Sequence, residues 1–280
     1  MCFSKTISLS TLFIILTISS FGQKNRIYSD VKRASRTPLE VIRLDLQMVH
    51  LKKSDFKKIA KFNNLETLDI SVAGLKKFPK ELLALKNIKS LNISNNDLES
   101  IPKEILQLTS LEELVLGGNR LLELPTEVFL LENLKDLDLI DSKVKMELPI
   151  ELLDMKSLES LHCNSTVKEF EEIICKMTWL TCIEVFCEKA ISPCLLDSLP
   201  HIEKFKMTIR MGEKFQPFEC SLKGNKKLKE VDIHYYSCCW PYIQADKEEV
   251  ERIKTLLPDG CVLKGFRDQG GTIKSDIELR

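Results

Sequence analysis

The sequence has no excess of either charge. It contains 41 Lys and Arg residues and 41 Asp and Glu residues. Binding to nucleic acid or to an anionic membrane surface normally needs a net positive charge or a strong basic patch, so the composition offers no electrostatic case for either. With 44% hydrophobic and 29% charged residues, the chain has the ordinary composition of one soluble globular unit.

A long apolar run is also missing. The most apolar stretch, residues 12–18, is far shorter than the ~20 residues that a membrane-spanning helix needs. Ser20 and Gly22 are small residues placed three and one before Gln23, as at a secretory cleavage site. We therefore expect a signal peptide over residues 1–22, with a membrane anchor as the alternative. Export would make the protein periplasmic, extracellular or bound to the cell surface, with no membrane insertion after cleavage.

The spacings that hold metals or phosphates are absent. His162-Cys163 and His234 with Cys238-Cys239 contain ligand types but lack the paired spacing of zinc sites. The glycines in residues 116–119 (LGGN) fit a turn and do not form a phosphate-binding loop. The sequence therefore predicts no metal and no cofactor.

What the sequence does contain is a repeating pattern of apolar residues. They recur at the first, fourth, sixth and eleventh positions of residues 65–87, 88–110 and 111–133. Further copies follow the same outline at nearly the same interval, and one comes after an irregular insertion. The nine copies start at Val41, Leu65, Ile88, Leu111, Leu134, Leu158, Leu180, Ile202 and Leu228.

The first half of each repeat predicts a strand. In L-x-L the two apolar residues point to one face, because side chains alternate with period two. One such strand cannot bury that face alone, so the copies should stack into a parallel sheet over a continuous core. Asn96 and Asn119 stand where the chain leaves the sheet, and a short amide can satisfy open backbone groups there. Ser142 and Thr166 take that place later and predict a weaker ladder.

The second half of four repeats reads apolar-Pro-x-Glu, as at 78–81, 101–104, 124–127 and 148–151. Proline is tolerated in the first turn of a helix, and the glutamate that follows faces the positive end of the helix dipole. Apolar residues at helical spacing come next. We expect a short helix or 3₁₀ segment on the convex side of each repeat, with the proline in its first turn.

This pattern resembles the leucine-rich repeat family over roughly residues 41–266. The spacing of the proline-containing form is similar to that of intracellular Ras-binding leucine-rich proteins. With a signal peptide, the whole chain resembles exported bacterial leucine-rich repeat proteins. The resemblance implies an α/β solenoid, with a curved parallel sheet on the concave face and short helices or 3₁₀ turns on the convex face.

The remaining ranges divide the chain into predicted units. Residues 23–40 would form an N-terminal cap with a short helix capped by Ser29 or Asp30, and residues 41–209 the repeats. Residues 210–266 would hold an irregular last repeat and a C-terminal cap, which contains an amphipathic helix and a last strand. The tail, residues 267–280, shows no periodic signal.

Nine of the ten cysteines lie between Cys163 and Cys261. An odd number in the mature chain leaves at least one unpaired within the molecule. Cys163 takes a core-facing strand position, where a thiol packs as a small hydrophobe. Disulfides are possible in an exported chain, but one sequence does not fix the pairing. The candidates are Cys175 with Cys194, and Cys220, Cys238, Cys239 and Cys261 in the C-terminal cap.

The outward residues of the strands form columns across the concave face. One column contains Asp138, His162 and Glu184, and the next contains Ile140 and Phe186. Apolar residues among acids on an exposed sheet suit a protein-binding surface, although single exposed apolar residues are also common. We interpret these five residues as a candidate contact patch.

The leading hypothesis is therefore a non-catalytic scaffold that binds another protein through its concave sheet. One alternative is a module that binds carbohydrate or envelope polymers, for which aromatic residues are few. The other is a thiol-dependent effector enzyme that uses Cys182 or Cys187 near His162, although the chain after Ile209 leaves little room for a catalytic domain. The identity of the partner and the oligomeric state are not readable from the sequence.

Overall fold

The computed structural model describes residues 26–140, 148–164, 170–187, 195, 198–210, 225–236 and 247–264. The predicted signal peptide and the predicted tail lie outside these ranges, as do Ser142 and Thr166. The limits of the predicted units therefore stay predictions.

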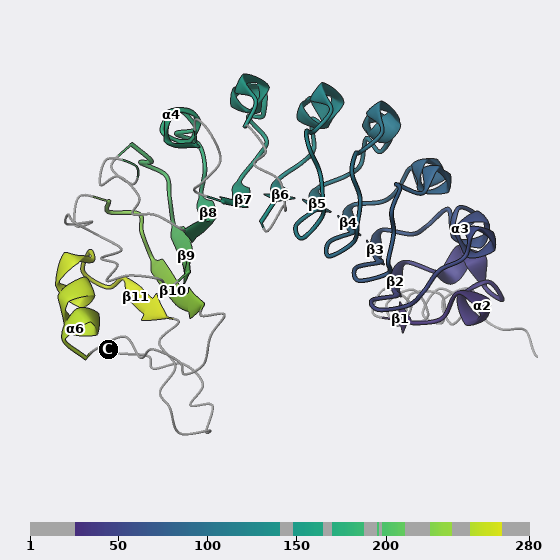
Figure 1. Cartoon of the computed structure of the whole chain (residues 1–280), viewed down its shortest axis with the longest axis horizontal. Helices are drawn as coiled ribbons and strands as arrows, with labels where there is room; N and C mark the ends of the chain where they lie inside the picture. The colour runs from purple at the N-terminus through teal and green to yellow at the C-terminus, as the bar shows by residue number, and fades with distance from the viewer. Residues whose placement is uncertain are drawn as a thin grey trace, which may run out of the picture.

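Within the described ranges the chain forms one open parallel sheet of eleven strands, arranged in sequence order from β1 to β11. Figure 1 shows the sheet lining the inside of an arch, with the helical segments along the outside. Nine strands, β2 to β10, begin two positions after the nine repeat starts, so the repeat register and the solenoid fold are confirmed. The strands are β1 (Ile27–Tyr28), β2 (Arg43–Asp45), β3 (Thr67–Asp69), β4 (Ser90–Asn92), β5 (Glu113–Val115), β6 (Asp136–Asp138), β7 (Ser160–Asn164), β8 (Cys182–Cys187), β9 (Lys204–Arg210), β10 (Glu230–Tyr236) and β11 (Val262–Lys264).

The convex side carries short helices, as expected. The proline-containing repeats form 3₁₀ turns, whereas α3 and α4 are α-helices in return segments that lack this proline. The elements are α2 (Val31–Ala34), η1 (Pro38–Glu40), α3 (Lys53–Ile59), η2 (Lys80–Ala84), η3 (Lys103–Gln107), η4 (Thr126–Leu130), η5 (Ile150–Asp154), α4 (Phe170–Ile174) and α6 (Lys247–Leu256).

The expected place of the proline was wrong by one position. Pro79 and Pro102 lie just before the helical turn, at the N-cap, with extended backbone and φ of −72°. The proline carbonyl accepts the first bond of the turn, as from Leu82 N–H at 3.0 Å. Proline suits this position because its fixed φ fits the extended conformation and its missing N–H is not needed there.

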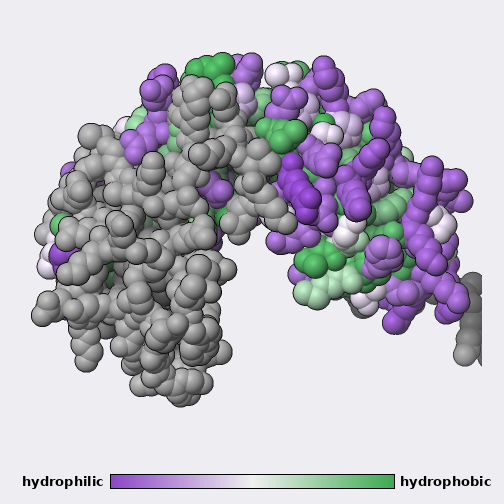
Figure 2. Space-filling model, viewed as in Figure 1, coloured by the Kyte–Doolittle hydropathy of each residue, from purple (hydrophilic) through white to green (hydrophobic). Residues whose placement is uncertain are grey.

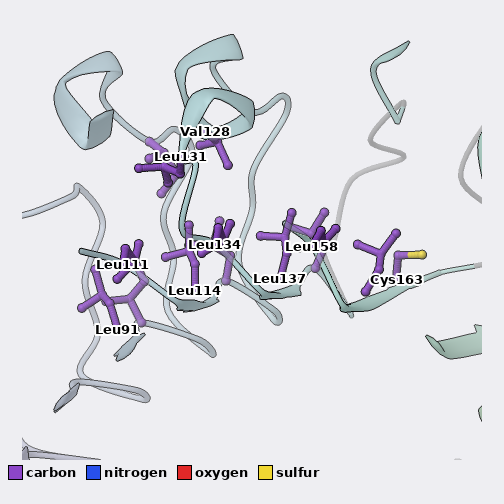
Figure 3. Packing of buried hydrophobic residues seen from close by; sticks show 14 of the residues in the cluster. Leu91, Leu111, Leu114, Val128, Leu131, Leu134, Leu137, Leu158 and Cys163 are labelled. Atoms are coloured by element: carbon purple, nitrogen blue, oxygen red, sulfur yellow. The ribbon is translucent and has the colours of Figure 1, made fainter. Parts of the chain in front are cut away.

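The core is one continuous cluster of apolar side chains between the sheet and the convex turns. Leu91, Leu114 and Leu137 occupy the central position of consecutive strands and are at most 1% exposed. Figure 3 shows these leucines in a row that continues to Cys163. Cys163 is fully buried, which confirms its predicted place in the core. Each such leucine contributes about 1.5–3 kcal/mol through burial.

Buried asparagines connect successive repeats, as the sequence predicts. Oδ1 of Asn96 accepts from the N–H groups of Ala73 and Leu75, both at 3.0 Å. Its Nδ2 donates to the carbonyls of Ile70, Ile93 and Ser94 at 2.9–3.1 Å. Asn119 likewise joins Leu98, Ile93 and Leu116. These side chains supply the hydrogen bonds that the backbone cannot make where it turns away from the sheet.

A residue with positive φ recurs at the same point of the turn after each of four successive strands. These residues are Met48 (62°), Val72 (55°), Asn95 (54°) and Gly118 (69°). Their recurrence at the same point of each copy shows that the repeat requires a left-handed residue here. Glycine and asparagine adopt this conformation readily, whereas a β-branched side chain is strained in it.

Both described ends of the sheet carry a covering segment. Asp30 caps α2, because its Oδ1 accepts from the N–H of Arg33 at 2.6 Å. At the other end, Ile253 and Leu257 in and beside α6 are buried in the core. Within the described ranges, no helix combines the length and apolar character needed to cross a bilayer.

Candidate functional site

The concave side of β6, β7 and β8 brings the predicted polar residues together. Asp138 pairs in register with His162, and His162 with Glu184. The next strand continues the row with Lys206. All four side chains are half-buried rather than fully exposed, because side chains of neighbouring strands crowd one another on a concave surface.

His162 is the centre of a charged network. Its Nδ1 lies 3.0 Å from Oε2 of Glu184, and its Nε2 lies 2.8 Å from Oγ of Ser160. Oδ1 of Asp136 is also 3.4 Å from Nε2. On its far side, Glu184 is 3.8 Å from Nζ of Lys206. The network therefore spans four strands, from β6 to β9.

The acidic neighbours keep the imidazole of His162 protonated. Burial alone would lower its pKa, but the hydrogen bonds to Asp136 and Glu184 and the charges of Asp136 and Asp138 raise the pKa from 6.5 to about 10. At neutral pH both ring nitrogens therefore carry protons. Nδ1–H donates to Glu184, and Nε2–H donates to Ser160 with Asp136 close by.

The side chain of Asp138 accepts a hydrogen bond from the backbone. Its Oδ1 accepts from the N–H of Ile140 at 2.8 Å, as Asp69 accepts from Ser71 and Asn92 from Ser94 in earlier repeats. Burial raises the pKa of the Asp138 carboxyl. Its contact with a partner stays a prediction, and the structure shows that Asp138 holds the turn that presents Ile140.

The two apolar residues of the candidate patch lie beside this network. Ile140 closely follows β6, and Phe186 lies on β8 opposite Asn164 and Thr208. Each is half-buried. The structure thus brings the five predicted residues onto three adjacent strands and the turn after β6.

Gly117 is expected to be intolerant of substitution, because the backbone at Ile140 lies against it. A Cβ at Gly117 would stand 2.6 Å from the Ile140 carbonyl oxygen and 3.1 Å from Oδ1 of Asp138. Gly117→Ala should therefore lower the free energy of unfolding by about 1–3 kcal/mol, measured by urea denaturation. Ser94→Ala, one repeat earlier, is the matched control and should change it far less.

Ser160, His162 and Glu184 have the connectivity of a Ser–His–acid catalytic triad. The protonation state argues against that chemistry, since a general base must accept a proton from the serine. With a pKa of about 10, His162 holds its proton at neutral pH. The arrangement suits a fixed charged surface better than nucleophilic catalysis.

Burial makes one of the described thiols, Cys261, less reactive. Cys175, Cys182 and Cys261 are free thiols. Burial, followed by the charge of Glu230, raises the pKa of the Cys261 thiol to about 11, which favours the unreactive protonated form. Cys182 lies opposite Ser160.

The other predicted disulfide partners, Cys194, Cys220, Cys238 and Cys239, lie outside the described ranges, as does the side chain of Cys187. Cys175 and Cys261 form no disulfide with a described residue, and the disulfide pattern stays a prediction. Among the described residues, no group of three or more His, Cys, Asp or Glu side chains is placed to hold a metal ion.

Three residues of the network escaped the sequence interpretation. Asp136 and Ser160 belong to the first outward column of the strands, and Lys206 was not selected although it belongs to the same column as His162. The period-two pattern could have identified Asp136 and Ser160 as outward neighbours of His162. It could not have shown that their side chains reach the imidazole.

Comparison with known proteins identifies the type of repeat. Residues 63–121 match the family model described as leucine rich repeat. No curated protein sequence matches the chain.

Similar solved structures include internalin C2 from Listeria monocytogenes, with 17% identity and a TM-score of 0.47 over 76% of this chain and 84% of that one. A leucine-rich repeat protein from Leptospira interrogans has 18% identity and a TM-score of 0.47 over 86% and 100%. The plant peptide hormone receptor RGFR1 in complex with RGF2 has 22% identity and a TM-score of 0.47 over 80% and 36%. Residues 63–121 therefore carry leucine-rich repeats, and the regular spacing of the strands and the parallel sheet with its buried asparagines show that the described chain has the leucine-rich repeat fold.

Proposed function

We propose that this protein is a non-catalytic scaffold that binds another protein through the concave surface of β6 to β8. The leucine-rich repeat fold commonly serves as a protein-binding scaffold. The observation that carries the proposal is the pairing of an ordered charged network around His162 with the half-exposed apolar side chains of Ile140 and Phe186. The predicted signal peptide would place this surface outside the cytoplasm.

The network supports specificity more than general adhesion. The charged groups are held in place by one another before any partner arrives, so little side-chain entropy is lost on binding. A partner must match their arrangement, since it would otherwise leave partly buried charges without compensation. Ile140 and Phe186 would supply the apolar contacts at the centre of such an interface.

Site-specific photocrosslinking tests the surface while the partner is still unidentified. A benzophenone amino acid at position 140 or 186 should give a discrete light-dependent adduct from envelope extract or culture medium. An excess of unlabelled wild-type protein should compete for that adduct. Leu130 and Ile150, exposed aliphatic residues of η4 and η5 on the convex side, are matched control positions and should give none.

The opposite pattern would contradict the proposal. Adducts of equal yield from all four positions would indicate nonspecific contact, and adducts from positions 130 and 150 alone would move the binding surface to the convex side. A polysaccharide adduct in place of a protein would favour the polymer-binding alternative.

A further inference from the structure

A second apolar surface lies at the N-terminal limb of the arch, on the turns that follow β2 and β3. Met48 is 72% exposed, Val72 41% and Val49 37%. The two turns are in contact, because the N–H of Met48 donates to the carbonyl of Ser71 at 2.9 Å. We call these three residues the N-terminal rim patch, and Figure 2 shows apolar surface on this limb of the arch.

The backbone of the rim patch is strained for the side chains that it carries. Val72 has φ of 55° and Met48 has φ of 62°. A left-handed conformation costs an L-residue roughly 1–2 kcal/mol, and a β-branched residue is especially unsuited to it. The next two repeats place Asn95 and Gly118 at the same point. Local folding thus favours asparagine or glycine, so the exposed valine and methionine need another explanation, such as a contact.

Four lysines closely follow the rim patch residues in the sequence. Lys52 and Lys53 follow Met48 by four and five positions, and Lys76 and Lys77 follow Val72 in the same way. All four lysines are exposed. None forms an ion pair with any residue in the described part of the chain.

The charge changes sign farther along the arch. Residues 26–80 contain 13 Lys and Arg and 6 Asp and Glu, a net charge of +7, whereas residues 81–140 contain 5 and 11, a net charge of −6. The balanced total therefore conceals a basic limb next to an acidic one. A negatively charged partner would be attracted to the basic limb and repelled by its neighbour.

We propose that the N-terminal rim patch binds an acidic segment of a partner protein whose apolar side chains contact Met48, Val49 and Val72. The carboxylates of that segment would pair with Lys52, Lys53, Lys76 and Lys77. This surface is separate from the one around His162, since it occupies the turns of β2 and β3 and uses no residue of β6 to β8. A partner could contact either surface or extend from one to the other along the concave side.

Fluorescence anisotropy with the full chain and synthetic peptides tests this chemistry. The probe is a labelled dodecapeptide of alternating leucine and glutamate. One control peptide replaces the leucines with serine, and another replaces the glutamates with lysine. The leucine–glutamate peptide should bind at least tenfold more tightly than either control, and its affinity should fall as salt rises from about 50 to about 300 mM, since salt screens exposed charges.

The substitution Val72→Asn separates binding from folding. Asparagine adopts positive φ more easily than valine, so the variant should melt at a higher temperature than the wild type. The double variant Val72→Asn with Met48→Ser should bind the leucine–glutamate peptide at least tenfold more weakly than the wild type. Misfolding cannot explain weaker binding by a substitution that raises the melting temperature.

The charge is tested by Lys52→Glu, Lys53→Glu, Lys76→Glu and Lys77→Glu combined, which should abolish peptide binding. The combined variant Lys57→Glu with Lys61→Glu is the matched control and should bind as the wild type does. It replaces two exposed lysines, one in α3 and one just after it.

Equal affinity for the three peptides, or unchanged binding by Val72→Asn with Met48→Ser, would overturn the proposal. So would binding to vesicles of anionic lipid without peptide binding, or a wild-type dimer in light scattering that Val72→Asn dissociates, because each assigns the patch to a different occupant.

Discussion

Replacing Asn96 with leucine is expected to lower the free energy of unfolding by about 3–5 kcal/mol, because each buried polar group left without a partner costs about 1–3 kcal/mol. The side chain is 4% exposed and its two ends satisfy five backbone groups in adjacent repeats. Leucine can replace none of these bonds. The unfolding free energy is measured by urea denaturation followed by circular dichroism.

Asn87 provides a matched control, because its amide also bonds to the preceding repeat but at the surface. Its Nδ2 donates to the carbonyl of Asn63 at 2.8 Å in an exposed position. Asn87→Ala should cost about 1 kcal/mol or less, since water replaces the lost bond. If Asn96→Leu were as mild as Asn87→Ala, the buried asparagines would not be what joins one repeat to the next.

Replacing His162 with glutamine is expected to destabilise the protein at low pH and not at high pH. The pKa of His162 is raised from 6.5 to about 10 in the folded protein. A raised pKa stabilises the fold fully below about pH 6.5, and this contribution declines as pH rises and is lost above about pH 10. The difference in unfolding free energy between wild type and variant should be about 2–3 kcal/mol at pH 6 and should shrink steadily toward pH 10.

Two further measurements check the cause. The NMR titration of the His162 Cε1–H resonance should have its midpoint near pH 10, and Glu184→Gln should move this midpoint downward because it removes one of the two acids that hydrogen-bond to the ring. His50→Gln replaces an exposed histidine and should change the stability by less than about 0.5 kcal/mol. A His162 midpoint near its ordinary value of 6.5 would contradict the charged network around the imidazole.

The repeat itself was readable because it follows short-range rules. Leucines spaced for alternating strands and a proline at a fixed place in each copy need no knowledge of distant contacts. The buried asparagines and the core position of Cys163 follow from the same register. The error of one position at Pro79 and Pro102 arose because proline fits both the N-cap and the first turn, and spacing alone does not separate the two.

The site was only partly readable. Alternation assigns Asp138, His162 and Glu184 to the same face, and the parallel register confirms that they are neighbours. Alternation does not reveal the side-chain directions that bring Ser160 and Asp136 to the same imidazole. Nor does it reveal the crowding that half-buries the side chains of this network. The strain at Val72 is likewise invisible in the sequence, because it depends on a backbone angle that the neighbouring repeats impose.

The sequence by itself determined the period, the parallel order of the strands and the residues that fill the core. These depend on which side chains avoid water, and that property belongs to each residue wherever it stands. The tertiary structure decided the charge state of His162, the structural task of Asp138 and the exposure of Met48 and Val72. The charge state of His162 depends on contacts between residues about one repeat apart in the chain, which exist only once the repeats are stacked. The hydrogen bond that Asp138 accepts from Ile140 and the exposure of Met48 and Val72 depend on the conformation of the turns after their strands.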